Sequence, residues 1–258
     1  MDEFSLTGKT ILITGASSGI GRETAILAGE YGATLFITGR NPVRLRETFN
    51  RLGKTGDTLR VASDESTSPR HVSRVTDLII ETEMDALVDA LPPLDGIVHC
   101  AGIVGPLPAK FITQPDIDHM FGINYHAPVK LTGKILRKKK LSNGASILFM
   151  STIATKNPYF GGALYSGSKA ALEAYSKTLA LELVSKGIRS NCIMAGLVHT
   201  PMIENPSEKN MQEEALERYL KRYPLGIGQP KEIARATIFF MSDASKWITG
   251  TSLIMGGE

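Results

Sequence analysis

Short apolar runs alternate with amphipathic stretches along almost the whole chain. The apolar runs are rich in β-branched residues, which is typical of strands buried on both faces, and the stretches between them have a helical period. We predict strands at residues 9–14, 34–38, 71–76, 95–100, 145–150, 187–194 and 252–255. We predict helices at residues 19–30, 42–52, 81–90, 116–139 and 230–242, and a further helix that contains Tyr165 and Lys169 and continues through 170–183.

Strands that alternate with helices in this way predict an α/β fold. The expected architecture is a doubly wound, parallel sheet of seven strands with helices on both faces, in a single domain that covers residues 1–258. Two stretches break the pattern. Residues 53–69 read as a surface insertion with a short strand at 58–62. Residues 196–228, with an amphipathic helix near 208–223, suit a substrate-binding loop or lid over a cleft.

Composition narrows the class of protein further. The chain has 258 residues, 42% of them apolar, and 29 basic against 26 acidic side chains give a formal net charge of +3. This balance argues against a nucleic-acid partner. We find no signal peptide and no apolar run long enough to span a membrane, so we expect a cytoplasmic protein without a membrane partner. The histidines lack metal-ligand spacing, and we expect no metal.

A glycine-rich turn lies between the first predicted strand and the first predicted helix. It reads Thr-Gly-Ala-Ser-Ser-Gly-Ile-Gly, and its candidate cofactor-binding residues are Gly15, Ser17, Ser18, Gly19, Ile20 and Gly21. Glycines let the backbone approach a pyrophosphate, and the free N–H groups at the start of a helix bind its charge. The turn therefore predicts a dinucleotide site, although tight packing alone would also favour glycines here.

The same turn spells Gly-x-Ser-x-Gly, the nucleophile elbow of α/β-hydrolases, with Ser17 at its centre. An elbow needs an acid and then a histidine downstream. His199 has the right place in chain order, but no pattern singles out an acid. We keep this hydrolase reading as the weaker alternative.

Arg40 follows the second predicted strand, where a dinucleotide fold commonly places an acid for the adenosine ribose. A guanidinium there can bind a 2′-phosphate through paired, charge-assisted hydrogen bonds, which an acid would repel. Arg40 therefore favours NADP(H) over NAD(H); the alternative is a solvated surface charge.

Tyr165 and Lys169 stand four residues apart, on one face of the predicted helix. A phenol titrates near pH ~10, and a neighbouring ammonium would lower that pKa by stabilising the phenolate. The pair is a plausible proton-transfer device, although such pairs also arise by chance.

Together these motifs resemble the short-chain dehydrogenase/reductase family, in its NADP-preferring form. The glycine turn is similar to the family's cofactor turn, Tyr165 and Lys169 to its active-site pair, and Asn124 to its helix asparagine. Further matches to its cofactor-binding positions are Asp77, Leu78, Ala101, Gly102, Val198 and Thr200. The resemblance extends over nearly the whole chain.

The resemblance implies a Rossmann fold and hydride transfer between NADP(H) and a carbonyl or alcohol substrate. It also implies that Tyr165 is the catalytic proton donor or acceptor. Lys169 would lower the pKa of this tyrosine and hold the nicotinamide ribose, and Asn124 would support a proton relay through water. A homo-oligomer, either a tetramer or a dimer, is implied through the long helices and the final strands.

Three positions depart from the family pattern. The family serine belongs 13 residues before the tyrosine, where this chain has Thr152, with Ser151 just before it. Alternation along a strand points these two side chains to opposite sides, and the register favours Thr152 as the catalytic hydroxyl. Threonine keeps the hydroxyl but adds a methyl group and a stiffer χ1, so we expect reduced activity. Cys100 and Ala195 replace the family's asparagine and proline.

The sequence thus predicts an NADP-dependent ketone reductase or secondary-alcohol dehydrogenase, with 3-oxoacyl thioesters as the best substrate class. A sugar, a steroid or another small alcohol is the alternative within the same chemistry. A catalytically weak NADP-binding protein is the alternative of another class, and it is motivated by Thr152 and Cys100.

Overall fold

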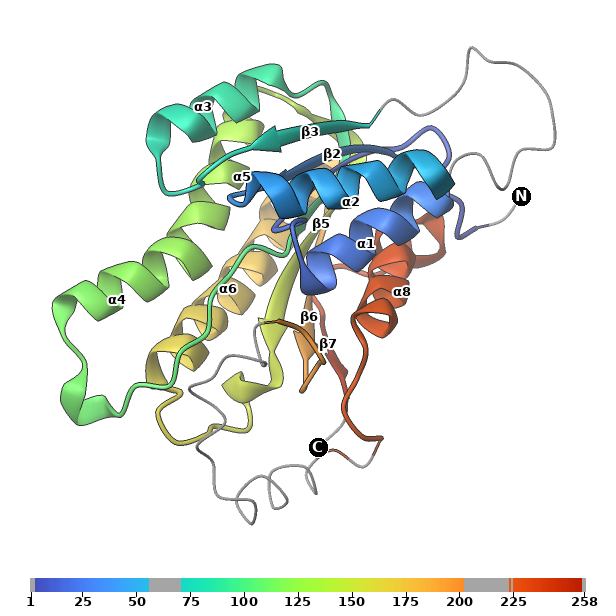
Figure 1. The fold of residues 1–258 in the computed structure, drawn as a ribbon. Coiled ribbons are helices and arrows are strands. Elements are labelled where there is room, and N and C mark those ends of the chain that lie inside the picture. The colour runs from blue at the N-terminus through green and yellow to red at the C-terminus, as the bar shows by residue number, and fades with distance from the viewer. Residues whose placement is uncertain (1–2, 56–70, 202–222, 224, 257–258) are drawn as a thin grey trace.

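The computed structural model describes residues 3–55, 71–201, 223 and 225–256. Within them, seven parallel strands form one sheet in the order β3-β2-β1-β4-β5-β6-β7 (Figure 1). The strands are β1 (Thr10–Thr14), β2 (Thr34–Gly39), β3 (Val72–Val75), β4 (Leu94–His99), β5 (Leu141–Thr152), β6 (Arg189–Ala195) and β7 (Ser252–Met255). The predicted doubly wound, parallel sheet is confirmed.

Helices cover both faces of the sheet. They are α1 (Gly19–Glu30), α2 (Pro42–Thr55), α3 (Glu81–Ala90), α4 (Gln114–Phe121), α5 (Ala127–Arg137), α6 (Ala163–Glu182) and α8 (Pro230–Met241). Short helical turns are η2 (Ala109–Phe111), η4 (Ile153–Thr155), η5 (Val184–Lys186) and η6 (Asp243–Ser245), and η3 (Gly122–His126) is a π-helix.

The sheet separates two apolar cores. Helices α1, α2 and α8 cover one face, and α3, α5 and α6 cover the other (Figure 1). Side chains of the first group form one core with alternate strand residues such as Ile11 and Ile13, and those of the second group form the other with residues such as Leu12. Strand side chains alternate between the two faces, so both faces of each central strand must be apolar. This requirement explains the continuous apolar runs in the sequence.

Two elements differ from their predicted bounds in ways that bear on function. β5 begins at Leu141, earlier than predicted, because Ser142, Asn143 and Gly144 interrupt the apolar strand pattern. It also continues beyond its predicted end, through Ser151 and Thr152. The long helix predicted at 116–139 is divided by the π-helix η3. Pro128 has no N–H to donate to the carbonyl four residues earlier, at Asn124, so this interruption has a physical cause in the sequence.

Two predictions fall outside the described residues. These are the short strand at 58–62 and, apart from Tyr223, the amphipathic helix at 208–223. Of the helices in the described part of the chain, none is long and apolar enough to cross a membrane.

Candidate active site

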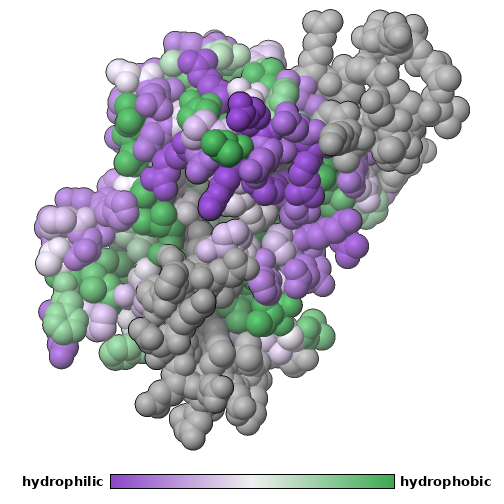
Figure 2. All heavy atoms as spheres, in the orientation of Figure 1, coloured by the Kyte–Doolittle hydropathy of each residue, from purple (hydrophilic) through white to green (hydrophobic). Residues whose placement is uncertain are grey.

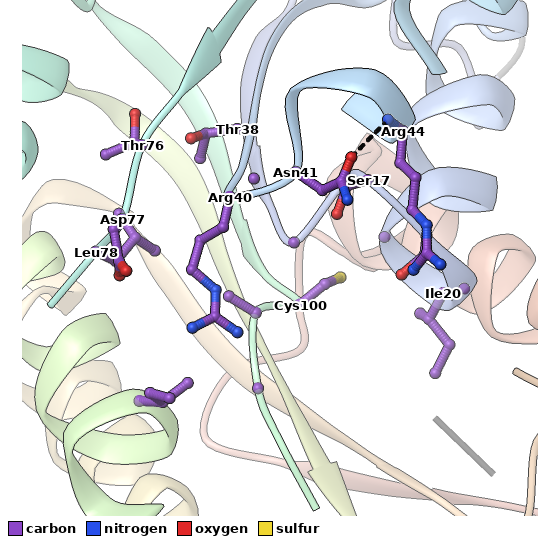
Figure 3. A pocket seen from close by; sticks show the side chains of 18 of the residues that line it. Ser17, Ile20, Thr38, Arg40, Asn41, Arg44, Thr76, Asp77, Leu78 and Cys100 are labelled. Atoms are coloured by element: carbon purple, nitrogen blue, oxygen red, sulfur yellow. Dashed lines mark hydrogen bonds between the residues drawn. The ribbon is translucent and has the colours of Figure 1, made fainter. Parts of the chain in front are cut away.

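A cleft of about 350 Å³ opens at the carboxyl ends of β1, β2, β3 and β4 (Figure 3). The strand order reverses between β1 and β4, and ligands of doubly wound folds bind at such a switch point. Predicted cofactor residues that line the cleft are Gly15, Ser17, Ser18, Gly19, Ile20, Gly21, Arg40, Asp77, Leu78, Ala101, Gly102 and Thr200. The predicted cofactor-binding residues from four strand ends thus converge on one cleft.

The glycine turn holds the backbone closer than any side chain allows. Gly15 has a φ of +66°, and a Cβ atom there would lie 2.7 Å from the Ala101 nitrogen. A Cβ atom on Gly21 would lie 2.4 Å from the Gly15 carbonyl oxygen. The turn enters α1 directly, so its N–H groups face the cleft as an anion site. This cradle fits the pyrophosphate of a dinucleotide.

Two side chains brace the glycine turn against α2, and the sequence motifs did not reveal them. Arg22 donates a 2.7 Å hydrogen bond to the Ser17 carbonyl and a 3.1 Å hydrogen bond to Glu47. Thr48 donates a 2.9 Å hydrogen bond to the Ala16 carbonyl. The start of α2, which borders the cleft, is therefore tied to the turn.

Arg40 and Arg44 both line the cleft at its β2 end (Figure 3). Their side chains are exposed, and neither has an ion-pair partner among the described residues. Asn41 accepts a 2.9 Å hydrogen bond from the Arg44 backbone N–H, which fixes the start of α2. Hydrophilic residues gather over α2 on this side of the molecule (Figure 2). The β2 end of the cleft is thus suited to an anion.

Thr152 and Ser151 point to different partners. The Thr152 hydroxyl lies near the Tyr165 phenol and favours its ionised form, which lowers the pKa of the phenol. Ser151 instead donates a 2.5 Å hydrogen bond to the buried carboxylate of Glu173 on α6. Alternation along β5 turns Ser151 toward α6, whereas Thr152 ends the strand, where the first turn of α6 brings Tyr165 to it.

Burial shifts the pKa values of both Tyr165 and Lys169 on α6. It raises the pKa of the Tyr165 phenol, and the nearby Thr152 hydroxyl opposes part of that rise. Burial lowers the pKa of Lys169 to about 8. The Lys169 ammonium donates a 2.8 Å hydrogen bond to the Met150 carbonyl rather than to the phenol. The expected lowering of the tyrosine pKa by Lys169 is therefore absent from this geometry.

The Asn124 amide is used to hold the segment that follows β4. Its oxygen accepts a 2.8 Å hydrogen bond from the Ile103 N–H, and its nitrogen donates a 2.9 Å hydrogen bond to the Ile103 carbonyl. Gly102 lies between Asn124 and Lys169, since a Cβ atom there would be 3.2 Å from both side chains. The Asn124 side chain thus shapes the cleft wall beside Lys169.

Cys100 lines the cleft where the family pattern has asparagine. Burial raises the pKa of its thiol to about 12, although the Lys169 charge and the nearby Thr24 hydroxyl oppose the rise. The thiol is therefore neutral at physiological pH and serves as a small packing group. The neighbouring Ala101 N–H still donates to Thr14, at 3.2 Å, which holds β4 to β1.

Not every predicted residue lines the cleft: Asn124, Thr152, Tyr165, Lys169 and Val198 are not among its lining residues. Val198 is buried in the core and bridges to Gly228, while Thr200 two residues later does line the cleft. Lining residues that the motifs missed are Thr38, Gly39, Asn41, Arg44, Thr76, Ile79, Cys100, Ile123, Ala127 and Pro201. Several of these residues lie at or directly after the end of a predicted strand, where doubly wound folds bind ligands, and this position could have identified them from the sequence. Ile123 and Ala127, beside the π-helix, had no such signal.

Comparison with known proteins decides the family. The family described as enoyl-(acyl carrier protein) reductase matches residues 15–257. The chain is 31% identical over 253 residues to a 3-oxoacyl-[acyl-carrier-protein] reductase of Rickettsia felis, which covers 98% of this chain and 97% of that protein. The chain belongs to the short-chain dehydrogenase/reductase family.

Other relatives support this family and differ in their substrates. A 3-oxoacyl-[acyl-carrier-protein] reductase of Thermotoga maritima is 30% identical, with 98% of each chain covered. The solved structure of a 7α-hydroxysteroid dehydrogenase, complexed with NADH and 7-oxo glycochenodeoxycholic acid, is 26% identical. It has a TM-score of 0.86 and covers 99% of this chain and 96% of that one.

Family membership fixes the class of chemistry. This short-chain dehydrogenase/reductase is an oxidoreductase, and its family acts on CH–OH groups with NAD(P)(H) and small-molecule substrates. The hydrolase reading of the glycine turn is thereby set aside. The Ser17 side chain instead packs against Gly39 on the cleft wall, where a Cβ atom on Gly39 would meet it at 3.1 Å.

Proposed function

We propose that this protein reduces a ketone with NADPH, and that Tyr165 donates the proton. The observation that carries the proposal is the proximity of the Thr152 hydroxyl to the Tyr165 phenol, near a cleft shaped for a dinucleotide. Two neighbouring hydroxyls provide two donors for one substrate oxygen.

The raised pKa of Tyr165 favours the direction of reduction. A phenol that remains protonated at neutral pH is ready to donate to an oxygen that gains negative charge. Bound NADPH supplies the hydride to the carbonyl carbon. Thr152 donates a hydrogen bond to the carbonyl oxygen, and Tyr165 transfers its proton to the same oxygen as the alcohol forms. Lys169 would hold the nicotinamide ribose of the bound cofactor, and Asn124 keeps the adjacent wall in place.

The preference for NADPH rests on Arg40. It lines the cleft after β2 with Arg44 close by in sequence, and the segment Gly39-Arg40-Asn41 carries no acid. Two guanidinium groups without ion-pair partners in the described part of the chain would bind a 2′-phosphate through charge-assisted hydrogen bonds. Arg44 joins the predicted Arg40 in this role.

The substrate that we propose is a 3-oxoacyl thioester, because several relatives at about 30% identity are 3-oxoacyl-[acyl-carrier-protein] reductases. A steroid ketone is the second candidate, which the similarity to the 7α-hydroxysteroid dehydrogenase structure favours. Both substrates present a ketone to the same pair of hydroxyls.

Oxidation of NADPH, followed by its absorbance, tests the proposed function. The substrates are a 3-oxoacyl thioester, a steroid ketone and a small sugar ketone, each with NADPH and with NADH. We expect turnover with NADPH on at least one ketone, led by the thioester. Tight binding of NADPH without turnover on any ketone would instead identify a dormant NADP-binding protein.

We also propose that the protein forms a homo-oligomer, either a tetramer or a dimer. Large apolar side chains are exposed on the last turn of α6, at Leu181, and on the edge strand β7, at Ile254; Trp247 is 97% exposed. Apolar surface of this kind favours burial against a second copy. Light scattering coupled to size exclusion tests this, and a mass of 27.9 kDa would show a monomer.

A further inference from the structure

Glu173 is a buried carboxylate on α6, one turn beyond Lys169. Its Oε1 accepts hydrogen bonds from the Ser151 hydroxyl at 2.5 Å and from the Thr155 hydroxyl at 3.0 Å. No ion pair involves Glu173 within the described residues. Burying a carboxylate with hydroxyl partners alone is costly, so this arrangement calls for a reason.

The two donors stand on either side of Thr152 in the chain. Ser151 precedes it on β5, and Thr155 ends the turn η4 that follows it. The Thr155 hydroxyl also donates a 3.2 Å hydrogen bond to the Thr152 carbonyl. Glu173 therefore fixes the backbone before and after Thr152.

The Thr152 side chain depends on that backbone. Its hydroxyl oxygen accepts a 3.2 Å hydrogen bond from the Ala154 N–H, inside η4, so the position of the turn sets the position of the hydroxyl. A threonine has few χ1 choices with which to correct a displaced backbone. Because Glu173 and Tyr165 belong to the same helix, the carboxylate fixes the turn relative to the phenol.

We propose that Glu173 is a positioning residue for the reduction: it holds η4 against α6 so that the Thr152 hydroxyl meets the substrate oxygen together with Tyr165. The role rests on the proposed function, and Glu173 acts through Thr152 without touching substrate. It also gives Ser151 a role, since its hydroxyl donates a hydrogen bond to Glu173.

The first test compares Glu173→Ala with Glu173→Gln. We expect Glu173→Ala to lower kcat by about tenfold or more with little change in the KM for NADPH, because a displaced hydroxyl weakens the chemical step and not cofactor binding. Glu173→Gln should retain most of kcat, since an amide oxygen can still accept both hydroxyls. The matched control is Glu182→Ala, an exposed carboxylate on the same helix, and it should leave kcat unchanged.

The second test is a double-mutant cycle with Thr152→Ala. If Glu173 acts through Thr152, then Glu173→Ala should cause no further loss of kcat once the hydroxyl is gone. Thr155→Val removes one hydrogen-bond donor to Glu173 and keeps the shape of the side chain. It should likewise cause no further loss of kcat once Thr152 is alanine, and it replaces Glu173→Ala in the cycle if that variant does not fold. If the wild type turns over but the losses of kcat in Glu173→Ala and Thr152→Ala multiply in the double variant, the positioning role of Glu173 is wrong and the proposed function still stands. Absence of wild-type turnover would overturn the proposed function and this role with it.

Discussion

The hydroxyl of Thr152 lies near the phenol of Tyr165, while the adjacent Ser151 donates a hydrogen bond to Glu173, about two turns further along α6. This pairing selects between two neighbouring hydroxyls, either of which would satisfy the chemistry in isolation. The threonine thus lies where the family pattern has serine, and the serine beside it belongs to a separate buried network.

Thr152→Ala should lower kcat by about ten- to a hundredfold, because it removes one hydrogen-bond donor to the substrate oxygen. Ser151→Ala should lower kcat by less than about threefold, since Thr155 still bonds Glu173. Steady-state kinetics with NADPH and the preferred ketone measure both variants. A larger loss in Ser151→Ala would place the catalytic hydroxyl one residue earlier than we propose.

Arg40→Ala should weaken NADPH binding by about ten- to a hundredfold and NADH binding by less than about twofold. The lost interaction is a charge-assisted hydrogen bond to the 2′-phosphate, which NADH does not carry. Cofactor fluorescence titration measures both affinities. Arg46→Ala, an exposed position on α2 that does not line the cleft, is the matched control. Equal losses for the two cofactors in Arg40→Ala would remove the phosphate role.

NADPH binding should weaken as the pH rises through about 8. Burial lowers the pKa of Lys169 to about 8, so above that pH the side chain loses the charge with which it would hold the ribose. The pKa of Tyr165 is raised, so the phenol stays protonated over the same range. Affinity measured by fluorescence from about pH 7 to about pH 9 should fall for the wild type. In Lys169→Met it should be weaker at pH 7 and nearly independent of pH; a pH dependence that persists in this variant would rule out Lys169 as its source.

Arg189→Met should lower the free energy of unfolding by about 2–3 kcal/mol. Arg189 is buried, and its guanidinium donates to the Phe240 carbonyl at 2.9 Å and to the Ser245 hydroxyl at 2.8 Å, at the carboxyl end of α8. A cation there complements the helix dipole and satisfies terminal carbonyls. Denaturant unfolding measures the change, and an unaltered midpoint would contradict the structural role. Lys231→Met, at the exposed start of α8, is the control.

The fold and the central motifs were readable from the sequence because each follows from local chemistry. Continuous apolar runs require a sheet covered on both faces, and α1, α3 and β7 were predicted with their observed bounds. The glycine turn can be recognised in the sequence because glycines are required where two backbone segments approach too closely for a Cβ atom.

Long-range contacts account for what the sequence did not reveal. The role of Glu173 depends on α6 packing beneath the end of β5, and no spacing relates Glu173 to Ser151. Lys169 was expected to act on Tyr165, but its bond to the Met150 carbonyl depends on how α6 meets the sheet. The bracing of the glycine turn by Thr48 likewise joins residues from separate elements. Such contacts follow from tertiary packing and leave no periodic signal.

The most direct test of hydride transfer assisted by the tyrosine is the turnover of Tyr165→Phe with NADPH and the preferred ketone. This variant removes only the phenol oxygen, so NADPH affinity should stay within about twofold of wild type while kcat falls by about a thousandfold. Tyr175→Phe, on the same helix, should keep wild-type turnover. If Tyr165→Phe reduced the ketone at the wild-type rate, the proton donor would be another group and the proposed mechanism would be wrong.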